Sequence, residues 1–284
     1  MLAHPLRPQT FPVAQQIAES FTARGAHAHA FTEWESAQVS DTLAACDVVV
    51  AIGGDGAMLR AARVSAPFGV PVLGINMGQL GFLTEINTPD AWPQALDRVL
   101  SGDFWIEQRM MVSAVLMRDE QPMCREHALN DVVVSSSMFG KMVLLETFID
   151  GDWTTTYYAD ALVISTATGS TAYALATGGP ILPPELKNIL LVPSAPHLSM
   201  DRPIVLAEGA TVRITPAENN TNEVIVMADG VQIGQLMRGD ALYVQAGDYI
   251  SRFLRLRGRN YFYRSLLDRL EPRVRRRGLE RHEG

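Results

Sequence analysis

The amino-acid sequence predicts an α/β N-terminal domain with a parallel sheet, followed by an all-β C-terminal domain that is antiparallel and sandwich-like. Apolar, β-branched runs in the first third end abruptly in glycine-rich loops, whereas alternating runs separated by Asp-Gly turns dominate after about residue 104. The length of 284 residues suits two domains. We therefore place the α/β domain at residues 1–103 and the β domain at residues 104–258, with the segment 259–284 packing back on the α/β domain.

The first third alternates helical and strand patterns. Residues 11–26 carry one apolar stripe at helical spacing and predict a helix. Residues 47–52 form a continuous apolar run that predicts a strand covered on both faces, and a helix follows from Met58. Residues 71–76 predict a second buried strand, while residues 1–3 would be only the stub of a first one. Strand, helix and strand in this order give a parallel sheet with functional loops at the carboxyl ends of its strands.

Strand patterns continue through the second part of the chain. Turns such as Asp150-Gly151-Asp152 and Asp229-Gly230 separate them. From Asn260 onward the pattern is helical, and it ends in a basic tail at 273–277, for which we favour a solvated helix end over a phosphate or partner role. The predicted strands cover residues 111–117, 131–135, 143–149, 161–165, 211–214, 223–227 and 241–244.

Composition and charge restrict the classes of function. The formal net charge is −7 and no basic run precedes the C-terminal tail, so we expect no nucleic-acid partner, because such binding needs clustered positive charge. No apolar window is long enough to cross a bilayer and the first residues do not form a signal peptide, so we expect no membrane attachment. Cys46 and Cys124 have neither metal nor redox spacing, which is typical of incidental thiols in a reducing cytoplasm.

The sequence Gly53-Gly54-Asp55-Gly56 stands where the first buried strand gives way to a helix. Glycines let the backbone approach a ligand closely, and the start of the helix presents N–H groups that suit phosphates. An aspartate there would repel phosphate unless it accepts a proton from an attacking hydroxyl or holds Mg²⁺. The alternative is a tight turn with Asp55 as the helix N-cap. Phosphofructokinases and the diacylglycerol and sphingosine kinases also contain GGDG, so the tetrapeptide indicates phosphoryl transfer without a specific substrate.

Two further loops follow predicted strands. Residues 76–85 should lie beside the first loop, where Asn76 can hydrogen-bond a hydroxyl or phosphate oxygen, although Phe82 can equally be core. Residues 159–174 run from a strand into a loop of Ser, Thr and Gly, whose small hydroxyls suit sugars and phosphates. There Asp160 can accept a hydrogen bond from an exocyclic amine and Tyr173 can stack on a base. Taken singly, these two residues are better explained as a turn residue and a core residue.

The order and spacing of five blocks resemble the NAD kinase family. The similarity runs from about His4 to Phe262, and its most specific block is the long Ser/Thr/Gly motif. The chain looks like a somewhat divergent, bacterial-type member of this family of ATP- or polyphosphate-dependent enzymes. The resemblance implies transfer of the γ-phosphate of ATP to the 2′-hydroxyl of the adenosine ribose of NAD, which gives NADP. The blocks are GGDG, NMGQLGFLTE, ALNDVVV, STATGSTAYALATGGPIL and PHLSMDRPIVL.

The resemblance also implies roles for particular residues. Asp55 matches the proton acceptor for the ribose hydroxyl, Asp160 matches the aspartate that reads the adenine amine, and Lys141 matches a basic residue that contacts substrate phosphate, including that of a neighbouring subunit. NAD is expected between domains and between subunits of a homodimer or homotetramer, with a divalent cation, Mg²⁺, accompanying ATP. The expected substrate-binding residues are Gly53, Gly54, Asp55, Gly56, Arg60, Asn76, Phe82, Asn130, Asp131, Lys141, Asp160, Thr168, Thr171, Ala172 and Tyr173.

The chain departs from the family pattern at several positions, and these departures keep two other functions open. The usual Asn-Glu pair is Asn130-Asp131, Ala161 and Ala167 replace a glycine and a proline, and Tyr158 and Val231 stand where arginine and glutamine are common. One alternative is a non-catalytic NAD(H)- or NADP-binding regulator that kept the fold. The other is a kinase for a different diphosphate or a lipid. The intact GGDG aspartate argues against the first, and the long Ser/Thr/Gly motif argues against the second.

Overall fold

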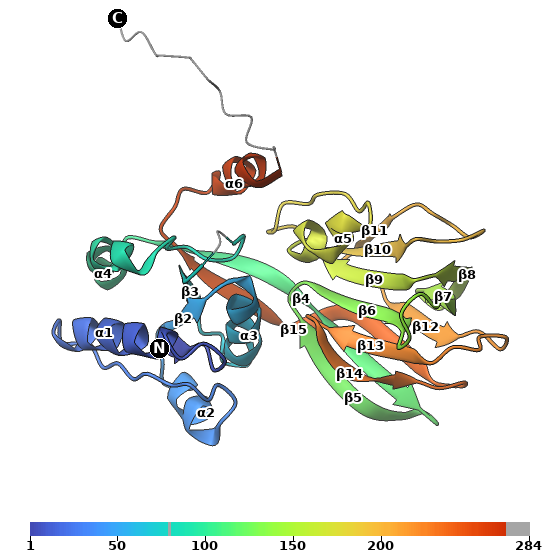
Figure 1. Cartoon of the computed structure of the whole chain (residues 1–284), viewed down its shortest axis with the longest axis horizontal. Helices are drawn as coiled ribbons and strands as arrows, with labels where there is room; N and C mark the ends of the chain where they lie inside the picture. Colours follow the sequence, from blue (N-terminus) through green and yellow to red (C-terminus); the bar gives the residue numbers. More distant parts are fainter. Residues whose placement is uncertain (79–80, 271–284) are drawn as a thin grey trace, which may run out of the picture.

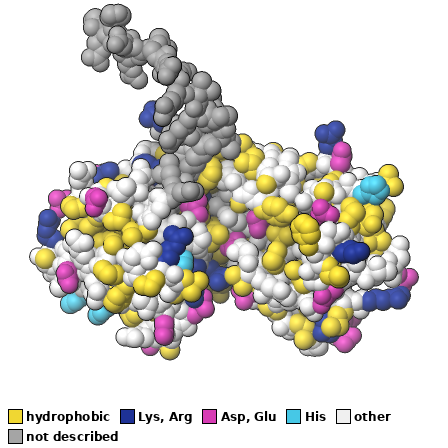
Figure 2. Space-filling view, viewed as in Figure 1, with side chains coloured by type: hydrophobic (Ala, Val, Ile, Leu, Met, Phe, Trp, Pro, Cys, Tyr) yellow, Lys and Arg dark blue, Asp and Glu magenta, His cyan; other side chains and the backbone are white. Residues whose placement is uncertain are grey.

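The computed structural model describes residues 1–78 and 81–270 and shows two lobes joined by a pair of long strands (Figure 1). In the space-filling view, side chains of both charge signs lie along the groove between the lobes (Figure 2). Two parts of the predicted motifs, Gln79-Leu80 of the second glycine loop and the basic tail at 273–277, lie outside the described residues.

The N-terminal lobe is a parallel sheet with helices on both faces, as the sequence predicted. The expected stub, β1 (Leu2–Ala3), pairs in parallel with β2 (Val49–Gly53), and β2 pairs with β3 (Val72–Asn76). Apolar side chains of α1 and α4 pack on one face of this sheet, and those of α2 and α3 pack on the other. The helices are α1 (Thr10–Thr22), α2 (Ala37–Leu43), α3 (Asp55–Ser65) and α4 (Trp92–Ser101), with short 3-10 turns at Ala66–Phe68 and Pro89–Ala91.

Two long strands, β4 (Trp105–Arg118) and β15 (Ala241–Arg255), run from one lobe into the other. They pair antiparallel with each other along most of their length, and β15 also pairs in parallel with β3 at Phe253 and Val72. One nine-stranded sheet therefore continues through both lobes, in the order β1-β2-β3-β15-β12-β7-β8. In addition, β4 pairs with β15, and β5 pairs with β4. The sequence predicted only the parts of β4 and β15 inside the second lobe, because buried charged residues interrupt the apolar pattern of the remainder.

The second lobe is the predicted antiparallel sandwich. Its six-stranded sheet has the order β11-β10-β9-β6-β13-β14 and packs on the nine-stranded sheet through an apolar core. Helix α5 (Tyr173–Ala176) lies over the outer side of β9 and β10, where Ala174 joins a small apolar cluster. The remaining strands are β5 (Gln121–Ala128), β6 (Asp131–Ser136), β7 (Val143–Ile149), β8 (Asp152–Ala159), β9 (Ala161–Thr166), β10 (Asn188–Ser194), β11 (Ile204–Ala207), β12 (Val212–Pro216), β13 (Val224–Ala228) and β14 (Val231–Leu236).

The chain returns to the N-terminal lobe through β15 and continues into α6 (Tyr261–Leu270). A group of buried charged and polar side chains lies at this return. Glu107 of β4 accepts hydrogen bonds from Arg109 and Arg255, each through its Nε atom, at 3.0 and 2.8 Å. The Tyr261 hydroxyl donates to Glu107 Oε1 at 2.8 Å and lies 2.8 Å from Arg109 Nη2, which donates to it. These contacts fasten the first turn of α6 to the ribbon of β4 and β15.

Burial and charge act in opposite directions on Glu107. Burial by itself would raise the pKa of this carboxyl above its ordinary value of 4.5, but the charges of Arg109 and Arg255 and the hydrogen bond from Tyr261 outweigh it and lower the pKa to about 2. A carboxyl with a lowered pKa in the folded state stabilises the protein above its unfolded pKa. That stability is lost as the pH falls from about 4.5 towards 2.

We expect Glu107→Gln to lower the free energy of unfolding at pH 7 by about 3–5 kcal/mol, because the buried Arg109 loses its counter-charge and the buried Arg255 keeps only that of Glu85. Urea denaturation at a series of pH values measures this difference. The difference in unfolding free energy between the variant and the wild type should become smaller as the pH falls below about 4.5, because Glu107 of the wild type is then protonated and loses its charge.

A matched control is Glu218→Gln, whose carboxylate pairs with Arg238 at the surface and is 88% exposed. This control should change stability by less than about 0.5 kcal/mol at any pH. A Glu107→Gln deficit that stays constant between pH 7 and pH 3 would contradict the assigned charge balance.

Candidate active site

The two glycine loops meet at the carboxyl ends of β2 and β3. Asp55 is the first residue of α3, and the N-cap is Gly54, whose lack of a side chain leaves the cap unfilled. The alternative role of Asp55 as a helix N-cap is therefore wrong. Its carboxylate instead accepts hydrogen bonds from the opposite loop, with Phe82 N–H at 2.7 Å from Oδ2 and Leu83 N–H at 3.0 Å from Oδ1. Two backbone donors thus fix the orientation of Asp55.

Glycine is required where these loops touch. A Cβ atom added at Gly81 would lie 2.0 Å from Asp55 Oδ1, so a larger residue there would displace the carboxylate. At Gly53 an added Cβ would lie 2.6 Å from the Cβ of Ala57. Both positions are close approaches that only glycine permits without a shift of the neighbouring atoms.

Asn76 shapes the second loop from within. Its side chain is buried, its amide donates to the carbonyl of Gly78 at 2.9 Å, and its Oδ1 accepts from the N–H of Gly78 at 3.2 Å. The sequence predicted that Asn76 would hydrogen-bond a ligand. In the structure the amide hydrogen-bonds the N–H and the carbonyl of Gly78 and so holds the loop in place, and the role of Asn76 toward a ligand stays a prediction.

The far end of the second loop is fastened by Glu85 to the end of β15. Glu85 Oε1 accepts from the backbone N–H groups of residues 256 and 257 at 2.8 and 2.7 Å. Arg255 donates from Nη1 to the carbonyl of Leu83 at 2.8 Å and lies 3.3 Å from Glu85 Oε2. Leu83 therefore accepts from the buried charged group through its carbonyl and donates to Asp55 through its N–H. Glu85 belongs to the predicted motif at residues 76–85, but this role could not be predicted from the sequence.

A third group of loops comes from the C-terminal lobe. The carbonyl of Asn130 accepts from the N–H of Thr166 at 2.9 Å and from the hydroxyl of Ser165 at 3.1 Å. A Cβ added at Gly169 would lie 2.1 Å from that same carbonyl oxygen, so the loop after β9 fits tightly against the turn before β6. The Thr168 hydroxyl is buried here with no hydrogen-bond partner among the described residues.

Asp229, at the turn between β13 and β14, holds the Asn130-Asp131 turn. Its carboxylate accepts from three successive backbone N–H groups, those of Leu129, Asn130 and Asp131, at 2.8, 2.7 and 3.3 Å. Its own N–H donates to the carbonyl of Asp131 at 3.0 Å, and its φ of +46° is in the left-handed region. From the sequence, Asp229 was predicted only as part of an Asp-Gly turn. The turn was the available signal, but its partner could not be read from the sequence.

The carboxyl groups of Asp131 and Asp229 are both buried, and they lie close enough to interact electrostatically. Burial, and after it the nearby negative charge of Asp229, raise the pKa of Asp131 from 3.8 to about 7. Burial also raises the pKa of Asp229, while its hydrogen bonds from the three backbone N–H groups and the charge of Arg63 act to lower it. Asp131 therefore changes its protonation near neutral pH.

The remaining predicted residues lie at the opposite end of the six-stranded sheet. Asp160 stands at the start of β9, exposed, with its N–H donating to the carbonyl of Ser194 at 3.0 Å. The hydroxyl of Tyr173 lies 3.4 Å from the hydroxyl of that serine, and exposed Lys141 follows the far end of β6. Since β9 spans six residues, about 17 Å separate this end from the end near Asp131. The structure thus brings Asp160 and Tyr173 together, but keeps them away from Asp131 along the strand.

Arg60, on the second turn of α3, pairs with Glu35 at 3.1 Å and lies 5.4 Å from the ring centroid of Trp34. Thr171 donates to the carbonyl of Thr168 at 3.2 Å, and Ala172 carries the irregular backbone that starts α5. Gly56 is exposed on the first turn of α3.

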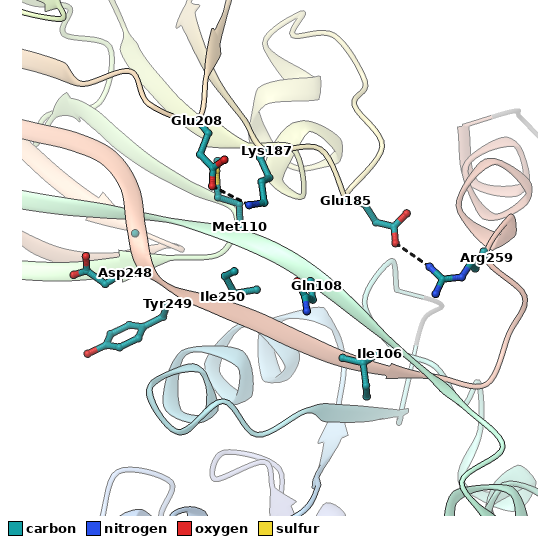
Figure 3. A pocket seen from close by; sticks show the side chains of 11 residues that line it. Ile106, Gln108, Met110, Glu185, Lys187, Glu208, Asp248, Tyr249, Ile250 and Arg259 are labelled. Atoms are coloured by element: carbon teal, nitrogen blue, oxygen red, sulfur yellow. Dashed lines mark ion pairs between the residues drawn. The ribbon is translucent and has the colours of Figure 1, made fainter.

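A separate cavity of about 400 Å³ lies beside the ribbon, where residues 247–249 of β15 bulge out of the pairing with β4 (Figure 3). Two ion pairs face it, Lys187 with Glu208 at 3.2 Å and Glu185 with Arg259 at 3.7 Å. Its β4 lining residues are 106, 108 and 110, which point away from the side on which Glu107 and Arg109 are buried. None of the predicted site residues lines this cavity.

The described residues contain no group of three or more His, Cys, Asp or Glu side chains that could hold a metal ion. Within residues 1–78 and 81–270 there is also no helix of the length and apolar character needed to cross a membrane.

Comparisons with known proteins agree with the geometry. Residues 8–104 match the family model of the ATP-NAD kinase N-terminal domain, and residues 129–256 match that of the ATP-NAD kinase C-terminal domain. The NAD kinase of Heliobacterium modesticaldum is 38% identical over 274 residues, which cover 93% of this chain and 95% of that protein. The NAD kinase of Moorella thermoacetica is 40% identical over 237 residues, which cover 84% and 75%.

Two solved structures share the fold. Yeast NADH kinase complexed with NADH superposes with a TM-score of 0.73 and 26% identity, covering 80% of this chain and 69% of that one. An NAD kinase from Archaeoglobus fulgidus in complex with ATP gives a TM-score of 0.72 at 24% identity, covering 89% and 92%. The second likeness concerns the fold alone.

We expect Asp131→Asn to stabilise the protein in a pH-dependent way. A carboxyl whose pKa is raised in the folded state contributes stability below its unfolded pKa of 3.8, and this contribution is lost as the pH rises towards 7. The neutral amide escapes that loss. The melting temperature of Asp131→Asn relative to the wild type should therefore increase between pH 4 and pH 7 and level off above it. Asp248→Asn, whose side chain is 69% exposed, is the control and should show no such trend; a flat difference for Asp131→Asn would refute the assignment.

Proposed function

We infer that this chain, which belongs to the ATP-NAD kinase family, is an NAD kinase that transfers the γ-phosphate of ATP to the 2′-hydroxyl of the adenosine ribose of NAD. The observation that carries this function is the placement of Asp55. Its carboxylate is held by the N–H groups of Phe82 and Leu83 at the carboxyl ends of two neighbouring parallel strands. This edge of an α/β sheet is where such folds bind nucleotides.

In the proposed mechanism, the Asp55 carboxylate takes the proton of the 2′-hydroxyl as its oxygen attacks the γ-phosphorus. A bond forms between the ribose oxygen and phosphorus, the bond between phosphorus and the β,γ-bridging oxygen breaks, and ADP leaves with that oxygen. The two backbone N–H groups keep Asp55 in one orientation, so little reorganisation is needed during the reaction. Phosphoryl transfer of this kind depends on positioning and charge stabilisation more than on covalent chemistry.

A divalent cation, Mg²⁺, enters with the donor in this proposal. Mg²⁺ retains several water ligands and is bound in kinases through one or two carboxylates together with substrate phosphates. The Asp55 carboxylate, at the mouth of the two glycine loops, fits that requirement, and the described residues offer no separate cluster of ligands. The ion supplies positive charge opposite the transferring phosphate.

We assign the acceptor ribose to the end of the six-stranded sheet that carries Asn130 and Asp131. The buried, unpartnered Thr168 hydroxyl there supports the assignment, because a polar ligand would satisfy it. Thr171 and Ala172 belong to the same loop. Asp131 in its ionised form can accept a hydrogen bond from a ribose hydroxyl, so NAD affinity should rise as the pH rises through 7.

Asp160, Lys141 and Tyr173 form the other end of the sheet, about 17 Å away along β9. We take this separation of the two strand ends as support for a role of Asp160 at a site other than the one that holds the ribose at Asp131 of the same chain. We propose that the chain forms a homo-oligomer and that Asp160 serves the dinucleotide bound to a second copy. The exposed apolar side chains of Met138 and Phe139, next to Lys141, support an interface at this end.

The non-catalytic alternative has little support. A pure dinucleotide binder would not need Asp55 anchored by two donors and a glycine that cannot be enlarged. We also propose that the protein acts in the cytoplasm, where Cys46 and Cys124, both free thiols, would stay reduced.

The function is tested by incubating the protein with ATP, Mg²⁺ and NAD and by measuring NADP with an NADP-specific dehydrogenase. Parallel reactions with polyphosphate in place of ATP, and with NADH in place of NAD, determine the donor and acceptor preference. Absence of NADP in every reaction, with a folded protein, would refute the kinase assignment and favour the binder.

We expect Asp55→Asn to lower kcat by about 10²–10⁴-fold, because the amide cannot take the proton of the hydroxyl. NAD binding, measured by calorimetry, should remain within a few-fold of the wild type. The control is Asp97→Asn, a change of the same chemistry in an exposed ion pair on α4. Full turnover of Asp55→Asn would contradict the assigned role of this carboxylate.

We expect Asp55→Asn and Asp160→Ala chains to complement each other if each site is shared between two copies. In a randomly assorted dimer population half of the dimers are mixed, and each mixed dimer contains one intact site, so about a quarter of wild-type activity should return. Doubly tagged mixed assemblies can be isolated and assayed for NADP formation. Mixed assemblies no more active than the parent variants would place both residues in one chain's site.

A further inference from the structure

The turn that follows β1 lies against the two glycine loops. Because β1, β2 and β3 are parallel neighbours, residues after β1 emerge at the same sheet edge as GGDG and residues 76–78. The ring of His4 lies close to Gly53, with its Cδ2 atom 3.5 Å from where a Cβ of that glycine would be. Arg7 Nη1 lies 3.9 Å from the corresponding point of Gly78. This turn thus extends over both loops.

The turn is held in one conformation. The buried Thr10 hydroxyl donates to the carbonyl of Arg7 at 2.8 Å, and the N–H of Arg7 donates to the carbonyl of His4 at 3.1 Å. The N–H of Leu6 donates to His4 Nδ1 at 3.1 Å, so the neutral imidazole carries its proton on Nε2. The exposed guanidinium of Arg7 is therefore presented from a fixed base.

Positive charge accumulates at this edge. Burial lowers the pKa of His4, and the positive charges of Arg7 and Arg60 lower it further, which places both guanidinium groups within electrostatic reach of the ring. Arg60 is balanced by Glu35 at 3.1 Å. Arg7, by contrast, has no carboxylate partner among residues 1–78 and 81–270.

We propose that Arg7, presented by the His4–Arg7 turn, binds the phosphate chain of the donor at the glycine loops. This inference rests on the proposed kinase function. The ligand class is a chain of anhydride-linked phosphates, whether it belongs to ATP or to inorganic polyphosphate. The negative charge of Asp55 disfavours a phosphate chain at the glycine loops, and an unpaired guanidinium with several donors offsets that repulsion.

The position of Arg7 separates donor from acceptor. Arg7 precedes α1 in the N-terminal lobe, whereas the acceptor groups at Asn130, Asp131 and Thr168 come from the C-terminal lobe. Loss of Arg7 should therefore affect the donor and leave NAD binding unchanged. A purely structural role would affect neither substrate selectively.

The test compares Arg7→Gln and Arg7→Lys with the wild type. Arg24→Gln is the matched control, since Arg24 is another exposed arginine of this lobe whose partner, Asp97, lies on α4. We measure KM for MgATP, KM for NAD, kcat, and inhibition by inorganic tripolyphosphate, which contains the phosphate chain without a nucleoside. Polyphosphate serves as the donor in a second set of assays.

We expect Arg7→Gln to raise the KM for MgATP and the inhibition constant of tripolyphosphate by about tenfold each, with the KM for NAD unchanged. Arg7→Lys should recover part of the loss, because lysine keeps the charge without the fork of donors. If polyphosphate is a donor, its KM should rise by the same factor. The difference from the wild type should shrink at high ionic strength.

Three results would overturn the proposal: an unchanged KM for MgATP, a raised KM for NAD with unchanged donor binding, or a raised KM for MgATP with unchanged tripolyphosphate inhibition. The last result would place Arg7 against the nucleoside. If the wild type forms no NADP, the kinase function fails by itself. Calorimetric binding of tripolyphosphate to wild type and Arg7→Gln then still decides whether this turn binds phosphate.

Discussion

The buried charged group at the return of β15 into the N-terminal lobe is the interaction on which the site depends. Glu107 balances Arg109 and Arg255, and isolated charges in such a place would cost several kcal/mol. Arg255 also donates to the carbonyl of Leu83, whose N–H donates to Asp55. Leu83 therefore links the position of the ribbon to that of the Asp55 carboxylate through its own N–H and carbonyl groups. The strand pair that joins the lobes and the loop that hydrogen-bonds Asp55 are therefore connected through Leu83.

Backbone N–H groups, rather than side chains, hold the site together on both sides of the groove. Asp55 accepts two of them from the second glycine loop, and Asp229 accepts three from the Asn130-Asp131 turn. In each case a carboxylate from one element fixes the loop of another. Glycines at positions 81 and 169 allow these loops to approach to distances that a side chain would forbid. Such a site tolerates many surface changes but few changes at the glycines and the two aspartates.

Two of the positions at which the chain departs from the family pattern lie near the two ends of the six-stranded sheet. At the end with Asn130 and Asp131, the N–H and the carbonyl of Asp131 both hydrogen-bond Asp229 at the β13–β14 turn. The end with Asp160 and Lys141 lies about 17 Å away along β9. Tyr158, another departure from the family pattern, is 40% exposed near that second end, where we propose that a second copy of the chain contributes.

The parallel sheet, the antiparallel lobe and the two glycine loops, with Asp55 in the first, could be predicted from the sequence alone, because strand and helix periodicity and glycine punctuation are local properties. The tertiary structure decided which groups meet. Asp229 lies a hundred residues from the turn it holds, Glu85 anchors a strand end about 170 residues away, and Asn76 uses its amide on its own loop. The separation of Asp160 from Asp131 follows from the length and register of β9 against β6. The register between strands that are distant in the sequence cannot be predicted from local patterns. The sequence could therefore identify these residues but not show which of them share a site.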